Sequence, residues 1–443
     1  MSDKKCAYCH LNILSMGFQR KYLKFLLLKK GCINIFKNSL FFVLLILTCF
    51  NLSGCSKEID HHHNEEEKTV PLKKQTIDPI QNQIETMSLD EKIGQMVLVG
   101  FDGTMYNNHI KEMIEKYHIG GFILFQRNIQ NSEQTLSLIN AIKASNSKNN
   151  KLPLFISVDE EGGRVSRMPK EMKKLPTNEK IGEVNNKNFS FTIGKVIGLQ
   201  LKSFGFNMNF APVLDINSNP KNPIIGDRSF GSNEKIVHTL GIETIKGLQC
   251  QNIISVVKHF PGHGDTAIDS HLGLPTVDHD LDRLKSFELV PFVNAIKNNV
   301  NAIMVAHILF PKIDANNPAT FSKRIITDIL RNNLAFDGVI ITDDMEMGAI
   351  SKNYPIGQAA VKSIQAGSDI VLVCHAYENQ LAVLNALKNA ILNNEISEEI
   401  INDHVYRILK LKKKYNLTDA SIQTINIEHI NSEVYNTLNE YLN

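Results

Sequence analysis

Short runs rich in valine, isoleucine and phenylalanine recur along the chain, and each is followed by a longer stretch with polar residues. Eight such runs occur, and we predict strands at 94–101, 120–125, 154–159, 207–215, 254–260, 302–310, 338–344 and 369–375. Stretches between them with helical spacing include 132–145, 280–299 and 378–394. Strands that alternate with helices are typical of parallel sheets joined by crossovers. Eight repeats predict an α/β fold, a (β/α)8 TIM barrel with a single catalytic domain.

The sequence also indicates where this barrel begins and ends. "SLDE" at 88–91 has the spacing of a helix capping box, and residues 397–417 form an expected closing helix. We therefore predict that the barrel domain covers 88–417 and that 418–443 is a C-terminal extension. A domain of this length is long for an average fold but ordinary for one barrel.

The N-terminus has the pattern of an export signal. Residues 1–38 carry many lysines and arginines and one acid, and they precede the apolar run 39–50, which is short for a bilayer span. "LSGC" at 52–55 resembles the lipobox of bacterial lipoproteins, whose cysteine is lipidated and becomes the new N-terminus. We expect 1–54 to be a signal peptide and Cys55 to carry the lipid.

A lipidated Cys55 predicts a protein anchored to a bacterial cell membrane and facing the extracytoplasmic side. The polar stretch 55–87 would then be a solvated tether between the anchor and the barrel. An ordinary secretory signal, or a core helix at 39–50, is the alternative for this region.

Composition and cysteine usage narrow the possible partners. The formal net charge is +2 and 21% of residues are charged, so no nucleic-acid partner is expected. Cys250 and Cys374 are the two cysteines of the barrel domain, and they suggest no disulfide framework. "CAYCH" at 6–10 has the spelling of a haem site but precedes the predicted cleavage point. We expect a monomer without a cofactor.

Polar residues gather at the C-terminal ends of the predicted strands. They are Asp159, Asp215, Lys258 with His259, His307, Asp343 with Asp344, and His375. A strand that is buried on both faces should end in apolar residues. In a (β/α)8 barrel this rim and its loops build the active site. Each residue alone could simply cap a helix or face solvent, but several on separate strands indicate a site.

The segment "KHFPGHGDTAIDSH" at 258–271 follows the fifth predicted strand. Its proline and two glycines allow the loop to bend over the barrel mouth. Asp269 and His271 have the spacing of a local carboxylate–imidazole pair, and such a histidine can serve as a general acid. His259, His263 and His271 have no familiar spacing of metal ligands, and a neighbouring lysine opposes a cation, so we expect no metal.

"KHFPGHGDTAIDSH" and "GVIITDD" are similar to motifs of glycoside hydrolase family 3, in particular its β-N-acetylglucosaminidases of the NagZ type. The similarity runs from 88–96 to the eighth predicted strand. Further matching segments are 158–168, 209–217, 222–232 and 306–314. The resemblance implies a retaining exo-β-N-acetylhexosaminidase. Such an enzyme removes terminal non-reducing β-linked N-acetylglucosamine from cell-wall muropeptides or chitooligosaccharides.

The resemblance also implies roles for individual residues. Asp343 matches the nucleophile that forms a covalent glycosyl-enzyme, His271 matches the acid–base residue, and Asp269 is its partner. The alternatives for Asp343 are that it only caps the following helix or that Asp344 is the nucleophile. Implied substrate-binding residues are Asp159, Arg167, Arg228, Lys258 and His259. His263, Asp265 and Arg164 lie in the same motifs, and we expect them to shape loops. Glu346 departs from the family pattern, which more usually has a small or polar residue there.

Three alternatives remain open at this point. A TIM-barrel metallohydrolase would use His259, His307 and His375 as ligands. A lipoprotein that only binds amino sugars would use the same rim without turnover. Within the glycosidase interpretation, phosphate could replace water as the acceptor, because a histidine repels an incoming anion less than a carboxylate does. The loop 261–271 is the segment that we expect to carry His271 over bound sugar.

Overall fold

The computed structural model describes residues 78–442. The expected signal peptide, Cys55 and most of the tether lie outside these residues. Within the described part, no helix is both long and apolar enough to cross a bilayer. The described residues belong to one compact unit, Thr76–Asn443.

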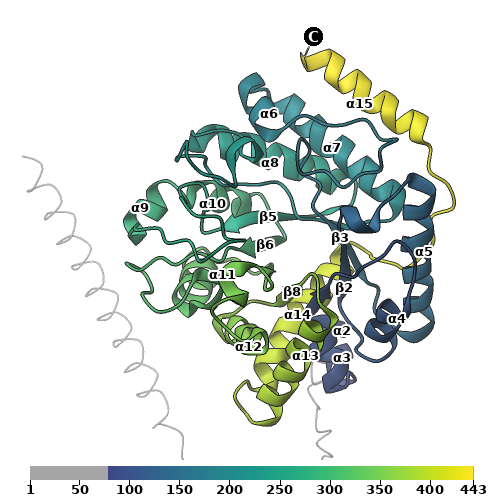
Figure 1. Ribbon diagram of the computed structural model, residues 1–443, viewed down its shortest axis with the longest axis vertical. Helices are drawn as coiled ribbons and strands as arrows, with labels where there is room; N and C mark the ends of the chain where they lie inside the picture. Colours follow the sequence, from purple (N-terminus) through teal and green to yellow (C-terminus); the bar gives the residue numbers. More distant parts are fainter. Residues whose placement is uncertain (1–77, 443) are drawn as a thin grey trace, which may run out of the picture. The chain divides into compact units, whose positions relative to one another are not determined.

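Eight parallel strands close into a barrel, in which each strand pairs with its neighbours along the chain and β8 pairs with β1 (Figure 1). The strands are β1 Val97–Val99, β2 Gly121–Leu124, β3 Phe155–Val158, β4 Met208–Asn209, β5 Ile254–Phe260, β6 Ala302–Val305, β7 Val339–Asp344 and β8 Ile370–Val373. The predicted (β/α)8 TIM barrel is confirmed.

Helices surround the strands (Figure 1). They are α2 Pro79–Glu85, α3 Leu89–Gln95, α4 Asn108–Glu115, α5 Ser132–Asn149, α6 Asn178–Val184, α7 Lys187–Phe204, α8 Glu234–Cys250, α9 Leu281–Ser286, α10 Val290–Lys297, η4 Arg324–Asn333, α11 Gly348–Ser351, α12 Ile356–Ala366, α13 Tyr377–Leu392, α14 Glu398–Lys414 and α15 Ile427–Leu442. Single turns are η1 Gln126–Asn128, η2 Gly226–Arg228 and η3 Ala319–Phe321. The predicted capping box is present before α3, because Ser88 Oγ accepts from the Glu91 N–H at 3.2 Å and the Glu91 carboxylate accepts from the Ser88 N–H at 2.7 Å.

The barrel core is apolar because the strands are covered on both faces. Every residue of β2, β3, β6 and β8 is buried. The largest fully buried side chains include Phe122, Phe155, Phe210 and Phe260. Burial on both faces produces the continuous hydrophobic runs by which the strands were predicted. Charged side chains are therefore found at the ends of the strands.

The N-terminal end of the barrel is closed by a buried ion cluster. Asp369, which precedes β8, accepts from Arg407 Nε at 2.7 Å and pairs with His404 Nδ1 at 2.8 Å, both on α14. Its second oxygen accepts from Arg331 on η4 and from the Ile340 N–H of β7 at 2.7 Å. This carboxylate joins two helices and two strands at the end opposite the polar rim.

Some predicted bounds were wrong. The fourth strand is two residues long instead of 207–215, because Pro212 has no N–H to continue the ladder. Pairing resumes only as an isolated bridge between Val213 and Lys258. The sixth strand ends at Val305, and the predicted helix 280–299 is interrupted between α9 and α10.

Candidate active site

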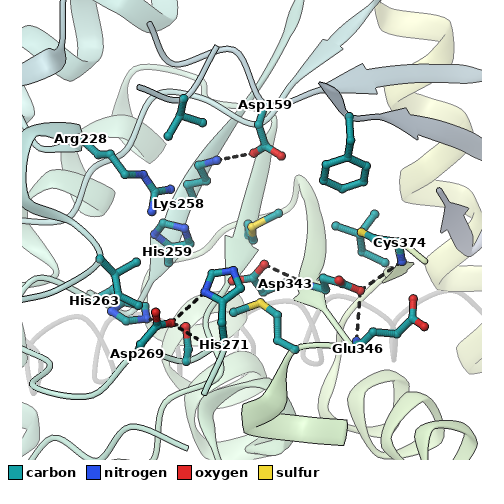
Figure 2. Close-up of a pocket in the computed structure, with 18 of the residues that line it drawn as sticks. Asp159, Arg228, Lys258, His259, His263, Asp269, His271, Asp343, Glu346 and Cys374 are labelled. Carbon is teal, nitrogen blue, oxygen red and sulfur yellow. Dashed lines mark hydrogen bonds and ion pairs between the residues drawn. The ribbon is translucent and has the colours of Figure 1, made fainter. Parts of the chain in front are cut away.

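A cavity of about 560 Å³ opens at the C-terminal end of the barrel. All eight residues for which a catalytic or binding role was predicted line it, and all but Arg167 are labelled in Figure 2. They are Asp159, Arg167, Arg228, Lys258, His259, Asp269, His271 and Asp343. The structure therefore brings together side chains that are up to 184 positions apart in the sequence, from Asp159 to Asp343.

Asp343 and Asp344 end β7, and their carboxylates have different surroundings. Asp344 is buried, and its Oδ1 accepts from the N–H groups of Glu346 and Cys374, each at 3.1 Å. Asp343 accepts from the Asp344 N–H at 2.8 Å. Burial opposes ionisation of Asp343, but the nearby His259 and His307 outweigh it and hold its pKa below the ordinary value. Asp343 therefore has the ionised carboxylate that a nucleophile needs.

A chain of ion pairs forms one wall of the cavity. Lys258 Nζ lies 2.6 Å from Asp159 Oδ1 and 2.7 Å from Glu161 Oε1. Arg228 donates to both oxygens of Glu161, at 2.8 and 2.9 Å. Burial alone would raise the pKa of Glu161, yet the two cations hold it well below its usual range. The Lys258 ammonium and the Arg228 guanidinium are thus held at the cavity by the carboxylate of Glu161, which both contact.

His259 is oriented by a carboxylate that had no predicted role. Its Nδ1 lies 2.6 Å from Asp215 Oδ2, and the same carboxylate accepts from the N–H of His263 at 2.7 Å. Asp215 is fully buried. A carboxylate bound at Nδ1 fixes the ring and leaves Nε2 as the nitrogen that can meet a ligand.

His271 lies on the loop that follows β5. Its Nδ1 is 2.9 Å from Asp269 Oδ1, and its backbone N–H donates to the same oxygen at 2.8 Å. The His271 side chain is 65% exposed, in contrast to the buried wall of the cavity. Figure 2 shows the imidazole directed toward the cavity, which Asp343 also lines. The two residues thus approach the cavity from different segments.

The arginine at 167 is held through its backbone. Its N–H donates to Glu160 Oε2 at 2.7 Å, and Glu160 is a buried carboxyl whose pKa burial raises to about 7. Arg167 Nη1 donates to the backbone oxygen of Ser166 at 3.4 Å, and the residue lines the cavity. An arginine with free donors at a cavity can hold hydroxyl, carbonyl or anionic groups.

The three motif residues expected to shape loops do make loop contacts. Arg164 pairs with Asp227 at 2.6 Å, and Asp265 pairs with His279 at 2.8 Å. His263 bonds Ser270 Oγ at 3.2 Å. Two of the three, Arg164 and His263, also reach the cavity lining.

Known proteins resemble this chain in sequence and in fold. The sequence profile of the glycosyl hydrolase family 3 N-terminal domain matches residues 88–411. The chain belongs to this family. The curated relatives of this family 3 chain include Beta-hexosaminidase A of Pseudoalteromonas piscicida, which is 39% identical over 340 residues. That alignment covers 72% of this chain but 57% of the relative, so the chain spans little more than half the length of that protein.

Further similar proteins agree with the match. A Beta-hexosaminidase of Neisseria meningitidis serogroup B is 38% identical over 264 residues, which is 58% of this chain and 72% of the relative. Among solved structures, a glycoside hydrolase family 3 beta-N-acetylglucosaminidase from Paenibacillus sp. str. FPU-7 superposes with a TM-score of 0.76 at 40% identity. That superposition covers 80% of this chain and 69% of the other.

Two further features of this family 3 site were not predicted. Glu161 lies two residues after Asp159 in the matching segment 158–168, and that position was the only signal for it. Glu346, which departs from the family pattern, lines the cavity and also holds the start of α13: its carboxylate accepts from the N–H groups of His375 and Ala376, the latter at 2.9 Å. Its carboxylate therefore serves the β8–α13 connection.

The histidines of the metallohydrolase alternative have other partners. His307 bonds Thr320 Oγ1 at 2.6 Å and the Asp344 backbone oxygen at 2.9 Å, so both ring nitrogens are occupied. His375 pairs with Asp344 at 3.3 Å and stacks on Phe125 at 5.7 Å between ring centres. Across residues 78–442, no group of three or more metal-ligating side chains is present.

Proposed function

We propose that the chain is a retaining exo-β-N-acetylglucosaminidase of family 3. The observation that carries the proposal is the placement of Asp343 and the His271–Asp269 pair around one cavity. Beta-hexosaminidase relatives and the Paenibacillus beta-N-acetylglucosaminidase support the same reaction. Because the chain spans 57% of its first relative, the activity of the whole relative is not transferred without a test.

In the first step, the Asp343 carboxylate attacks the anomeric carbon, and a C–O bond to the enzyme forms as the glycosidic C–O bond breaks. His271 donates its proton to the departing oxygen, which leaves as an alcohol. Asp269 holds the imidazole in place and fixes its tautomer. In the second step, His271 removes a proton from water, water attacks the same carbon, and Asp343 is released.

The ion-paired wall would bind the terminal sugar. Asp159, Lys258 and Arg228 are fixed by one another and by Glu161, so their donors and acceptors are already oriented for hydroxyl groups. His259 Nε2 and the Arg167 guanidinium add directional contacts, including to the acetamido oxygen. A site oriented before substrate arrives loses less entropy on binding. One terminal residue would be held in this way, which fits exo cleavage.

Release of 4-nitrophenol from its β-N-acetylglucosaminide tests the reaction. We expect turnover that survives EDTA and is lost in Asp343→Ala and His271→Ala. Turnover that EDTA abolishes would point to the metallohydrolase instead, and sugar binding without turnover would point to the binding-only lipoprotein. In phosphate buffer, the product identifies the acceptor, because water gives N-acetylglucosamine and phosphate gives its 1-phosphate.

We also propose that Cys55 anchors the enzyme to the outer side of a bacterial membrane as a monomer. The support is the "LSGC" sequence after a short apolar run. There the enzyme would meet cell-wall muropeptides and chitooligosaccharides. Labelling of cells with a tagged palmitate tests the anchor: the wild-type chain should take up label and Cys55→Ala should not. Label in both forms would contradict it.

A further inference from the structure

The loop that carries His271 is bound to the segment that follows Asp343. The Ala349 N–H donates to the Ser270 backbone oxygen at 3.0 Å, and Lys352 Nζ donates to the Leu272 backbone oxygen at 2.8 Å. Ala349 lies in the short helix α11, and Lys352 ends it. These two bonds lie on either side of the histidine in sequence. The proposed acid–base residue is therefore tied to the peptide that begins at the proposed nucleophile.

Gly348 makes the closest approach in this contact. A Cβ at this position would lie 2.4 Å from the backbone oxygen of His271 and 3.1 Å from its carbonyl carbon. The first distance is shorter than any real contact of a methyl group, so a side chain here would push the loop away. Gly348 begins a helix, where alanine is favoured over glycine. The glycine is therefore explained by the close approach of the loop.

Ser270 is held from its other side by the barrel. It is 2% exposed, and its Oγ lies 3.2 Å from His263 Nε2, while His263 itself is bound to the buried Asp215. His271, the next residue, bonds only to Asp269 within its own turn and is largely exposed. The position of the imidazole is thus set by the loop backbone, which α11 and His263 hold between them.

We propose that Gly348 and Lys352 act as a latch that positions His271 for proton transfer. The proposal rests on the proposed glycosidase function. General acid catalysis requires the donor within hydrogen-bond reach of the leaving oxygen, and a displacement of about 1 Å is sufficient to slow such a step strongly. Gly348 is part of the cavity lining and Lys352 is not, and both would affect proton transfer through the position of the loop.

Leaving groups separate a positioning role from a general structural one. A sugar alcohol must be protonated as it leaves, whereas 2,4-dinitrophenolate leaves without an acid. We expect Gly348→Ala in the full chain to lower kcat/KM for N,N′-diacetylchitobiose by about tenfold or more, because acid assistance is worth at least that much. The same variant should lower kcat/KM for 2,4-dinitrophenyl N-acetyl-β-glucosaminide by less than about twofold.

Two further variants complete the test. Lys352→Met removes one bond without adding a clash, and it should show the same pattern with a smaller loss. Gly273→Ala is the matched control, because it lies on the same loop and a Cβ there meets nothing within 4 Å. It should leave kcat/KM for both substrates unchanged. Thermal unfolding of each variant checks that the fold is retained.

The outcomes separate the latch from the proposed function. Equal losses on both substrates, or no loss on either, would overturn the latch while the wild-type enzyme remains a glycosidase. A wild-type chain that cleaves neither substrate would overturn the proposed function and the latch with it. A selective loss on the disaccharide in Gly348→Ala and Lys352→Met, with Gly273→Ala unchanged, would establish the latch.

Discussion

Neighbouring carboxylates at the end of β7 show how local contacts divide one motif into two roles. Asp344 binds two backbone N–H groups and a histidine, so its oxygens are used by the fold. Asp343 lines the cavity and keeps a depressed pKa. We expect Asp343→Asn to lower kcat/KM at least about a thousandfold, because the nucleophile is lost. Steady-state hydrolysis of the 4-nitrophenyl glycoside measures it.

The matched control is Asp344→Asn, whose remaining oxygen can still accept from both N–H groups. We expect its kcat/KM to stay within about tenfold of the wild-type value. Azide should restore turnover to Asp343→Ala and release a glycosyl azide of inverted configuration. If Asp344→Asn lowered kcat/KM more than Asp343→Asn does, the assignment of the nucleophile would be reversed.

Glu160 gives the site a pH dependence of stability. Burial raises its pKa from 4.5 to about 7, so the folded state binds the proton more tightly than the unfolded state. The resulting stabilisation is complete below pH 4.5 and is lost as pH rises through about 7. Glu160→Gln mimics the protonated form and should remove this dependence. We expect urea unfolding to show that, between pH 5 and pH 8, the free energy of unfolding of the wild-type chain falls by up to about 3 kcal/mol relative to that of the variant.

Glu395→Gln, at an exposed position, serves as a control. Its free energy of unfolding should differ from that of the wild-type chain by the same amount at both pH values. Equal free-energy differences for Glu160→Gln at the two pH values would show that the Glu160 carboxyl does not titrate between them.

At the scale of elements, the charge cluster of Asp369 joins η4 and α14 to the barrel. Asp369→Asn keeps the shape of the side chain but leaves Arg331 and Arg407 without a counter-charge. Breaking a buried ion pair on one side costs about 3–5 kcal/mol. We expect that loss in the free energy of unfolding measured with urea. Because the cluster lies at the end opposite the cavity, kcat/KM of the folded variant should be unchanged.

Asp337→Asn is the comparison for this cluster. Asp337 pairs with Lys410 at 3.1 Å, and both side chains are mostly exposed. Its loss should cost less than about 1 kcal/mol. Similar losses in the two variants would contradict the view that burial makes Asp369 important.

Most of the barrel could be predicted because strands that are covered on both faces have continuous apolar sequences. The fourth strand could not, since apolar residues continue on both sides of Pro212 in "NMNFAPVLD" although the strand ends at Asn209. The break at 287–289 inside the predicted helix 280–299 is likewise hidden by periodic apolar residues. Length and hydrophobicity predicted the elements, while their ends depended on single backbone groups.

The residues around the cavity were predictable where a short motif carries them. Asp269 and His271 have an informative spacing within one motif, and the resemblance of a second motif, "GVIITDD", indicated Asp343. Glu161 could not be assigned, because its role depends on Lys258 and Arg228, which reach it from β5 and η2. Gly348 was also missed, since nothing local indicates that a loop 77 positions earlier, at His271, would press against it.

At the scale of the whole molecule, the two ends of the barrel have separate tasks. The cavity and its loops occupy the C-terminal end, whereas Asp369 and Lys412 are buried at the N-terminal end. Lys412 Nζ donates to Gln95 Oε1 at 2.7 Å and to backbone oxygens of Gly120 and Pro153 at 3.0 and 2.7 Å. Changes that weaken the closed end should therefore lower stability before they alter catalysis.

The segment 418–443 extends this separation to the outside of the barrel. Its helix α15 packs on α7 through a Tyr441–Phe189 ring stack at 5.0 Å, and Ile430, near the start of α15, is also buried. Figure 1 shows α15 at the periphery, beside α7. No residue of 418–442 lines the cavity.

Ile430→Ala therefore tests whether this segment stabilises the barrel without serving the site. Truncating a buried isoleucine costs about 2–5 kcal/mol, and we expect that loss in urea unfolding. The half-exposed Ile400→Ala should cost far less. Because α15 reaches the cavity only through α7 and the barrel wall, kcat/KM of Ile430→Ala should equal the wild-type value wherever the variant is folded. A fall in kcat/KM without a fall in stability would instead make α15 part of the active-site support.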